Sequence, residues 1–387
     1  MKILIAATSS EADSGASKCL IEVSKELLKR KYEIVVSLPR SGILEDILKE
    51  NDIPYVILHE YHSWYTGPQF KNNKFIFKSF LNKLSILKNI RYIKKNNIDI
   101  VHVNALTAYT VGRAGELCHI PVVWHMREFM NEDLGIQFYN KRYSVNVINH
   151  ASVGIAISNS IRDKWSKIFT LPIITVNDGV PIENYYFNRS KDYTSDIKYI
   201  LIYGRIVPQK GQDFFFRAIK YYIDHYNNKY IRCLWAGFIE NKSYYDSIQK
   251  YINDNNMSLI CKYLGNIDDV KKILSNVDIV CVCSKQEGFG RVTIESQLAG
   301  AIVLGTNSGA TSEIIQNGKT GYLYQYNDEE DFACKLDYIM NNMHNAYEVA
   351  KNGQEEAIIK YSITSNVDSI ENIYNNIVSN RCSKRCK

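Results

Sequence analysis

The chain of 387 residues contains 45% hydrophobic and 23% charged residues, which is a globular composition, and its formal net charge is +6. This length accommodates two domains that each bury a core, and no uninterrupted apolar run approaches the roughly eighteen residues needed to cross a bilayer. Nine cysteines, scattered mostly through apolar segments, argue against a disulfide framework and for reduced thiols in a cytoplasmic protein.

Strand-like and helix-like segments alternate through the first half of the chain. The run from Thr8 to Ser17, which contains Gly15, separates the first strand from a helix N-terminus, but it lacks the three glycines of a dinucleotide fingerprint. The alternation is typical of a parallel, doubly wound sheet. We expect strands near residues 2–8, 32–38, 55–59, 98–104, 121–126, 153–158 and 173–177.

Residues 61–98 form a basic segment with eight Lys or Arg residues and no acid, and apolar residues are interleaved near helical spacing. One interpretation is a crossover helix that packs on the sheet and exposes a solvated lysine face. The other is that residues 71–95 dock on an anionic membrane surface. We expect no nucleic-acid partner.

A second alternating series follows a boundary between Pro181 and Asp196. We therefore expect an α/β protein with two Rossmann-like, doubly wound domains, residues 1–185 and 196–365. Residues 366–387 form a C-terminal helix and basic tail, and the helix could pack back on the first domain. The series comprises strands 199–203, 231–237, 258–264, 277–283 and 301–305, and helices 212–225, 243–253 and 268–275.

The predicted site lies in a central cleft between the two domains, because ligands of such sheets bind outside the carboxyl ends of the strands. Arg205 and Lys210 flank a turn at the end of strand 199–203, where two cations can clamp a diphosphate without a metal. His125 ends strand 121–126 and is either a buried structural residue or a group of the site. No pattern indicates a serine or cysteine nucleophile.

Residues 284–295 hold two carboxylates around a glycine turn. Glu287 should lie at the carboxyl end of strand 277–283, and Glu295 should lie inside the helix that follows. At 1.5 Å per residue, Glu295 is roughly 7 Å along this helix, too far for both carboxylates to share one reacting atom. The helix N-terminus is a natural anion site, formed by the N–H groups of Phe289, Gly290, Arg291 and Val292.

These residues resemble a known family. The run EGFGRVTIESQLAGAIVLGTNSGATSEIIQNGKTGYL, residues 287–323, resembles the signature of the retaining glycosyltransferases of family four, the glycosyl transferases group 1, which have the GT-B fold. GRIVPQKG, residues 204–211, is similar to the donor-phosphate segment of that family. The resemblance covers the C-terminal domain closely, and the N-terminal domain agrees in architecture and in the motifs SGAS and WHMRE.

The resemblance implies a role for each site residue. Glu295 would bind the nucleotide ribose, and Glu287 would meet the hydroxyls of the donor sugar. Arg205 and Lys210 would neutralise the diphosphate as it leaves, and His125 would touch the sugar. Gly15 matches the second glycine of a Gly-Gly loop whose first position is Ser14 here. The other expected donor-binding positions are Gly265, Phe289, Gly290, Arg291 and Val292.

The function implied is transfer of a hexose or N-acetylhexosamine, with retained anomeric configuration, from a nucleotide diphosphate sugar to a glycan. UDP is the favoured nucleotide, and the acceptor is expected to be a lipid-linked precursor of a surface polysaccharide, as in capsule or lipopolysaccharide synthesis. No metal or cofactor is expected, and the enzyme would work at the inner face of the cell membrane. The alternatives are a nucleotide-sugar epimerase or sugar phosphorylase of the same fold, or a non-catalytic sugar-nucleotide binding module.

Overall fold

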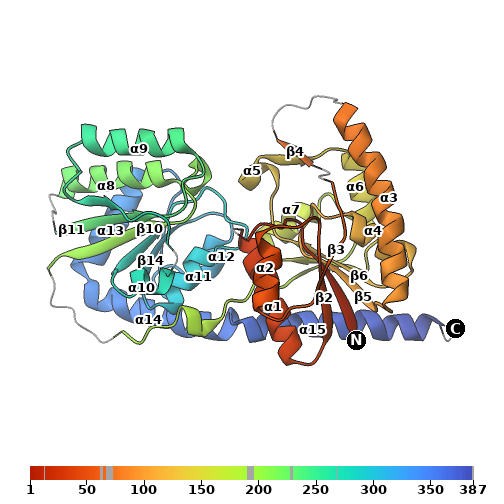
Figure 1. Cartoon of the computed structure of the whole chain (residues 1–387). Coiled ribbons are helices and arrows are strands. Elements are labelled where there is room, and N and C mark those ends of the chain that lie inside the picture. Colours follow the sequence, from red (N-terminus) through yellow and green to blue (C-terminus); the bar gives the residue numbers. More distant parts are fainter. Residues whose placement is uncertain are drawn as a thin grey trace. The chain divides into compact units, whose positions relative to one another are not determined.

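The computed structural model describes residues 1–12, 14–61, 64–66, 73–189, 196–226, 230–267 and 269–385 (Figure 1). The chain folds into two units, each with its own parallel sheet and core. Unit 1 comprises Met1–Val180 and Ile363–Lys387, and unit 2 comprises Pro181–Ser362. The C-terminal helix therefore belongs to unit 1.

The sheet of unit 1 has seven parallel strands in the order β3-β2-β1-β5-β6-β8-β9. Ile3 of β1 lies opposite Ile34 on one side and Ile100 on the other, so β1 and β5 mark the point where the strand order reverses. The strands are β1 (Lys2–Ala6), β2 (Glu33–Leu38), β3 (Tyr55–Ile57), β5 (Ile100–Val103), β6 (Val122–Met126), β8 (Val153–Ala156) and β9 (Ile173–Thr175).

Helices cover both faces of this sheet. On one face, α1 (Gly15–Lys29), α2 (Ile43–Glu50) and α15 (Ile363–Arg385) pack on β1 in a shared core that includes Leu27, Leu48 and Tyr374. On the other face, α4 (Thr110–Leu117) approaches β6 closely, since a Cβ at Gly112 would lie 2.6 Å from the Trp124 ring. Unit 1 also contains α5 (Asn131–Leu134), α6 (Lys141–Asn149) and α7 (Asn159–Trp165).

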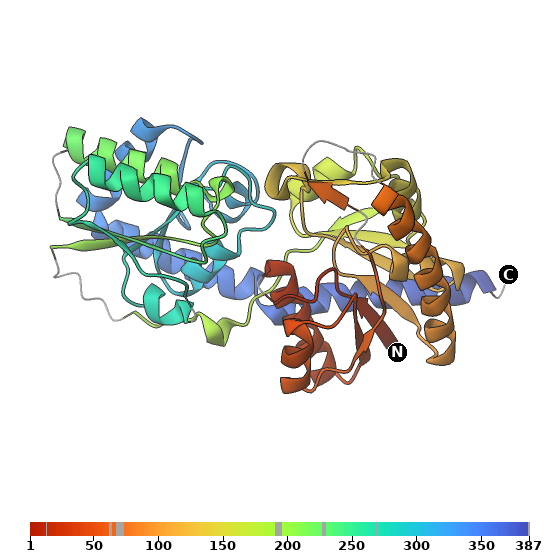
Figure 2. The same cartoon turned by 45° about the horizontal axis from the view of Figure 1, so that its top comes forward.

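The long helix α3 (Asn73–Lys95) packs against α4 and lies on the outside of unit 1 (Figures 1 and 2). Near it, β4 (Trp64–Thr66) pairs antiparallel with β7 (Ile136–Phe138). This ribbon joins segments about seventy residues apart and was not expected from the sequence.

Unit 2 contains six parallel strands in the order β12-β11-β10-β13-β14-β15, and the order reverses between β10 and β13. The carboxyl ends of these two strands therefore form the switch point where ligands bind in open α/β sheets. The strands are β10 (Lys198–Tyr203), β11 (Ile231–Ala236), β12 (Cys261–Tyr263), β13 (Ile279–Val282), β14 (Ile302–Thr306) and β15 (Tyr322–Tyr324).

The larger core of unit 2 lies under α8 (Gln212–Tyr226), α9 (Lys242–Asp254) and α13 (Glu329–Asn341), where Phe215, Trp235 and Phe332 are almost fully buried. On the opposite face, α10 (Val270–Leu274) and α11 (Arg291–Leu298) cover β10 and β13. The remaining helices are α12 (Thr311–Ile314), α14 (Met343–Lys360), and the short 3-10 turns η1 (Ile182–Asn184) and η2 (Pro208–Lys210).

The predicted fold class, an α/β protein with two parallel doubly wound domains, is confirmed. Five of the predicted features fall partly outside the described residues: the first turn at residue 13, the basic segment at 62–63 and 67–72, the boundary segment at 190–195, helix 268–275 at residue 268, and the last two residues of the tail. Within the described ranges, no helix combines the length and the apolar character needed to cross a membrane.

Candidate functional site

The turn after β10 is held against the end of β13 by a glycine. Gly211 follows η2 and has φ of +69°, a left-handed conformation that glycine adopts without strain. A Cβ at this position would lie 2.3 Å from the carbonyl oxygen of Cys283, so a larger residue cannot approach as closely. The sequence therefore places the preceding residue, Lys210, beside the segment that follows β13.

Lys210 and Glu287 form the central ion pair of this switch point. The Lys210 Nζ lies 2.6 Å from Glu287 Oε1, and the Ser284 hydroxyl donates to the same oxygen at 2.5 Å. The Glu287 side chain is 13% exposed and that of Lys210 is 25% exposed. Burial alone would raise the pKa of Glu287, but Lys210, Ser284 and Arg205 together lower it. Glu287 is therefore an anion held in one orientation.

Arg205 lies on the same turn but is more open to solvent. Its Nη1 contacts Glu240 Oε2 at 2.6 Å, and the two side chains are 41% and 46% exposed. Gln212 donates to the Arg205 carbonyl at 3.0 Å and so fixes the backbone of the turn. A pair this exposed contributes little to stability, which leaves Arg205 free to exchange Glu240 for a bound anion.

Glu295 lies in α11 and has partners of its own. Its carboxylate accepts hydrogen bonds from the Tyr203 hydroxyl at 3.1 Å and from Arg291 Nε at 3.3 Å, and the residue is 6% exposed. Burial and the nearby Glu295 raise the pKa of Tyr203 well above its usual value, so Tyr203 acts as a neutral donor. As the spacing predicted, Glu287 follows β13 and Glu295 lies inside α11, and the structure gives each carboxylate a different cation.

The turn between Glu287 and Glu295 leads into a helix N-terminus, as expected. Gly290 has φ of +89° and precedes α11, and no side chain caps the helix among the described residues. Phe289 is 5% exposed and packs edge-on against Tyr361 with a centroid distance of 6.0 Å. The backbone of Glu287 also packs against a second loop. A Cβ at Gly309 would lie 2.9 Å from the Glu287 backbone nitrogen, and the neighbouring Ala310 N–H donates to the Glu287 carbonyl oxygen.

Gly265 and Gly15 lie at two other predicted positions. Gly265 follows β12, has φ of +83°, and accepts a hydrogen bond from the Gly237 N–H at 2.8 Å, which joins the ends of β11 and β12. In unit 1, α1 begins at Gly15. Ser14, the departure from the Gly-Gly pattern, caps this helix, because its hydroxyl accepts from the Ser17 N–H at 3.1 Å.

His125 is completely buried within β6 and belongs to a chain of polar side chains in unit 1. Its Nδ1 lies 3.1 Å from His102 Nε2 and 3.3 Å from an Arg127 nitrogen, and His102 Nδ1 lies 2.5 Å from the Tyr374 hydroxyl on α15. Arg127 is anchored by Asp178 at 2.5 Å. These contacts connect His125, through His102, to Tyr374 on the C-terminal helix α15.

The hydrogen bonds between these polar side chains determine which ring nitrogen carries the proton on each histidine. Arg127 can only donate, so His125 Nδ1 accepts and the His125 proton resides on Nε2. His102 must then donate from Nε2, and its Nδ1 accepts from Tyr374. Burial and the Arg127 charge lower the pKa of His102 to about 3 and hold that of His125 well below 6.5, so both rings are neutral.

The second ring nitrogen of His125 is a buried donor without an acceptor among the described residues. Its Nε2 has no hydrogen-bond partner in the part of the chain that the structure describes, and it lies 3.9 Å from Asp178 Oδ1. A buried N–H without an acceptor is costly, and such groups occur where a ligand or a water completes them. The structure therefore supports either of the two interpretations of His125 given by the sequence.

Sequence reasoning missed the side chains that hold the site residues in place. Ser284 precedes Glu287 by three residues and could have been noticed as its donor. The others are distant in the sequence and carried no signal: Tyr203, Glu240, His102, Asp178 and Tyr374. Among the described residues, no group of three or more His, Cys, Asp or Glu could hold a metal ion.

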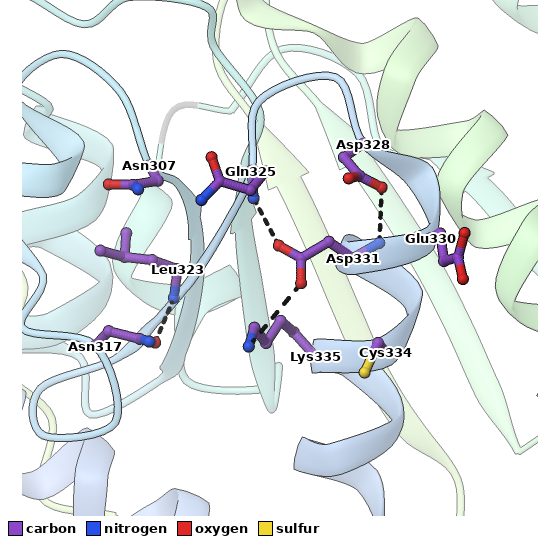
Figure 3. Close-up of a pocket in the computed structure, with 9 residues that line it drawn as sticks. All are labelled: Asn307, Asn317, Leu323, Gln325, Asp328, Glu330, Asp331, Cys334 and Lys335. Carbon is purple, nitrogen blue, oxygen red and sulfur yellow. Dashed lines mark hydrogen bonds and ion pairs between the residues drawn. The ribbon is translucent and has the colours of Figure 1, made fainter.

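A shallow cavity of about 610 Å³ lies elsewhere in unit 2, beside β15 and α13 (Figure 3). Several of the polar side chains that line it contact nearby residues of the same unit. Asp331 accepts from the Gln325 N–H at 2.8 Å and lies 3.9 Å from Lys335, while Asn317 accepts from the Leu323 N–H. None of the predicted site residues lines this cavity.

Two family models together match most of the chain. The model described as Glycosyl transferases group 1 matches residues 188–356, and the model described as Glycosyltransferase Family 4 matches residues 14–184. An uncharacterized glycosyltransferase of Methanocaldococcus jannaschii is 27% identical to this chain over 338 residues, 86% of this chain and 87% of the relative.

Two further proteins are similar over almost their whole length. The UDP-Gal:alpha-D-GlcNAc-diphosphoundecaprenol alpha-1,3-galactosyltransferase of Escherichia coli is 23% identical over 389 residues, 95% of each chain. The crystal structure of Anabaena HepE in complex with UDP has a TM-score of 0.81 at 20% identity and covers 97% of this chain and 100% of that one. This second likeness shows a shared fold.

Proposed function

The chain belongs to the glycosyl transferases group 1 and has their GT-B fold, and we propose that it is a retaining, metal-independent enzyme that uses a UDP-sugar. The proposed reaction moves a hexose or N-acetylhexosamine to a lipid-linked glycan, a precursor of a surface polysaccharide. Two findings support this choice of substrates: the E. coli relative is named for a UDP-galactose donor and a diphosphoundecaprenol acceptor, and HepE was crystallised with UDP-glucose.

The observation that carries the proposal is the Lys210–Glu287 pair at the β10/β13 switch point. In the proposed complex, Lys210 and Arg205 contact the diphosphate, and Glu287 accepts hydrogen bonds from the sugar hydroxyls. Glu295 accepts from the ribose hydroxyls, and the N-terminus of α11 faces the phosphate. The arrangement suits one extended ligand, because Glu287 pairs with Lys210 in the loop after β13, whereas Glu295 pairs with Arg291 inside α11.

The chemistry follows from this placement. The bond between the anomeric carbon and the diphosphate oxygen breaks as the acceptor oxygen attacks from the same face. Lys210 and Arg205 stabilise the charge that develops on the leaving diphosphate. The departing phosphate oxygen takes the acceptor proton, so no separate base is required. Glycosidases instead use two carboxylates that flank the scissile bond, which the different placement of Glu287 and Glu295 does not provide.

We further propose that α3 docks the enzyme on an anionic membrane surface. Its exposed side is apolar: the side chains of Ile76, Phe77, Phe80, Leu84 and Leu87, here called the α3 stripe, are between 44% and 67% exposed. Its buried side mixes the polar residues Asn82, Ser85 and Asn89 with the apolar residues Ile86 and Ile93. A crossover helix that only packs on a sheet would expose a mostly polar side, so the exposed α3 stripe favours docking.

Basic residues accompany the α3 stripe. Lys83 and Lys88 are exposed along its length, and Arg91, Lys94 and Lys95 are exposed in the last turns of the helix. This combination of an apolar stripe and cations suits an interfacial helix on anionic lipid. Lys71, the first residue of the segment expected to dock, lies outside the described residues, and the side chain of Lys74 is not described.

The test of the proposed function is a donor panel. The protein is incubated with UDP-, GDP- and ADP-sugars, with and without a lipid extract as acceptor, and released nucleoside diphosphate is measured. We expect acceptor-dependent release of UDP and a product whose anomeric configuration, read by NMR, equals that of the donor. An epimerase would change the sugar without transferring it. Absence of nucleotide release with every donor would contradict the proposal.

A further inference from the structure

A second cavity, of about 280 Å³, lies in unit 1 at the carboxyl ends of β1, β2 and β3. By volume it could hold roughly nine water molecules at about 30 Å³ each. It lies among parallel strand ends, the edge of the sheet where ligands of such folds bind, and none of the donor-site residues named above lines it. Its lining residues are Thr8, Ser9, Ser10, Pro39, Arg40, His59, Glu60, Tyr61 and Lys78.

The lining combines cations with hydroxyl donors. The two cations, Arg40 and Lys78, come from different segments, and His59 comes from a third. Arg40 contacts Glu11 at 3.4 Å, but both side chains are largely exposed, so this pair is easily exchanged for another anion. The Ser9 hydroxyl accepts from the Glu11 N–H, which leaves its own proton available for a ligand.

The one acid in the cavity is already satisfied. The Glu60 carboxylate accepts hydrogen bonds from the Tyr109 N–H at 2.8 Å, the Thr110 N–H at 3.2 Å and the Thr110 hydroxyl at 2.7 Å, so it holds the start of α4. Burial raises the pKa of Glu60 to about 7, although these hydrogen bonds oppose the rise. Glu60 therefore carries only part of a charge near neutral pH, and the cavity is cationic.

Helix α3 connects this cavity to the α3 stripe. The buried Asn82 side chain makes two hydrogen bonds to the Tyr61 backbone, to the N–H at 2.9 Å and to the carbonyl at 2.8 Å. Lys78 lies one turn earlier on the same side of the helix, which aims it into the cavity. The stripe is on the opposite side, about 10 Å away across a helix diameter.

This distance fits a lipid-linked ligand. An interfacial helix sinks its apolar side about 5–10 Å into the boundary between headgroups and acyl chains, so its far side lies near the headgroup level. We propose that the cavity binds a diphosphate group, that of the lipid-linked acceptor, through Arg40, Lys78 and the Ser9 hydroxyl. The proposal rests on the proposed function and assigns a second anion site, separate from the donor site of unit 2.

The test measures binding of farnesyl diphosphate and inorganic pyrophosphate by calorimetry. UDP is kept at saturation so that the donor site is occupied. The test protein is the double variant Arg40→Gln/Lys78→Gln. Its control, Lys25→Gln/Lys167→Gln, removes two exposed cations of unit 1 that do not line the cavity. We expect farnesyl diphosphate to bind the cavity variant at least about tenfold more weakly than wild type, since two charge-assisted contacts are lost. The control variant should bind as wild type does.

Each probe discriminates between explanations. Tighter binding of farnesyl diphosphate than of pyrophosphate supports the lipid-linked source, and equal affinities would overturn that source. Equal affinity of wild type and the cavity variant for both diphosphates would overturn the site itself. The donor panel is an independent experiment. If UDP is released but the cavity substitutions do not weaken diphosphate binding, only this inference is contradicted. If no UDP is released, the proposed function is contradicted and the binding test remains valid.

Discussion

At the scale of single residues, Glu287 is the group whose ionisation matters most to the proposed donor site. It stays ionised in a mostly buried place because Lys210, Ser284 and Arg205 outweigh the effect of burial on its pKa. Stabilisation by a carboxylate whose pKa is lowered on folding is present above the unfolded pKa and disappears as the pH falls through the folded value. The contribution of this pair should therefore be lost at acidic pH.

We predict that Glu287→Gln lowers the free energy of unfolding by about 1–3 kcal/mol at pH 7, since a buried charged hydrogen bond is lost. The difference from wild type should shrink as the pH falls below about 4.5, the unperturbed value. Urea unfolding at several pH values measures it. A difference that stays constant between pH 7 and pH 3 would contradict an ionised Glu287.

Tyr374 is the second residue with a specific prediction, because its hydroxyl supplies the proton at the end of the histidine chain. Tyr374→Phe should cost about 1–2 kcal/mol of stability, since the buried His102 Nδ1 loses its donor. Tyr322→Phe is the matched control: this hydroxyl is also buried and has no partner among the described residues, so its loss should be nearly neutral. Equal costs for the two variants would contradict the assignment.

The proton positions can be read directly. Nitrogen-15 NMR of wild type should show both His102 and His125 as neutral rings protonated on Nε2, since Arg127 can only donate to His125 Nδ1. A His125 protonated on Nδ1 would contradict the chain as described. This readout does not depend on activity or on stability.

At the scale of elements, the turn η2 is the part of the donor site most sensitive to its backbone. Gly211→Ala places a Cβ 2.3 Å from the Cys283 carbonyl oxygen, whereas Gly318→Ala has similar backbone torsion, with φ of +72°, and meets no described atom within 4 Å. Both variants should lose about 1–2 kcal/mol from left-handed strain. Gly211→Ala should lose about 1–3 kcal/mol more from overpacking and should also weaken UDP binding, because Lys210 moves. Identical behaviour of the two variants in unfolding and in UDP titration would contradict this role of Gly211.

The α3 stripe gives the other prediction at this scale. Phe77→Ser/Phe80→Ser should reduce sedimentation with phosphatidylglycerol vesicles by roughly tenfold or more, because each buried Phe contributes about 1.5–3 kcal/mol. Leu259→Ser/Ile359→Ser is the control, since these exposed side chains, at 93% and 73%, lie in unit 2. Unchanged partitioning of the α3 variant would mean that the stripe does not dock on lipid.

At the scale of the whole molecule, the fold was predictable because its signals are local. Continuous apolar strands alternate with amphipathic helices, and strands such as β5 and β6, which are buried on both faces, are typical of a parallel sheet. The β4–β7 ribbon escaped prediction because each strand has only three residues and the pairing is distant. The orientation of α3 also escaped, since periodicity reveals a stripe but not which side faces the core.

The candidate site could be predicted only in part, for a related reason. Arg205, Lys210 and Glu287 follow adjacent strands, so the topology alone brings them to one edge. The contacts that orient side chains depend on packing between distant segments. Tyr203 beside Glu295 and Tyr374 behind His102 are examples that no local pattern reveals. The roles of the site residues in donor binding and turnover remain predictions.

The measurement that tests the central claim most directly compares Glu295→Ala with Glu287→Ala in UDP binding and in turnover. If Glu295 holds the ribose and Glu287 holds the sugar, Glu295→Ala should weaken UDP binding by about tenfold or more, as expected for a lost hydrogen bond to a charged group. Glu287→Ala should bind UDP within a few-fold of wild type but lose most of its turnover. Wild-type UDP affinity in Glu295→Ala, or full turnover in Glu287→Ala, would contradict the account.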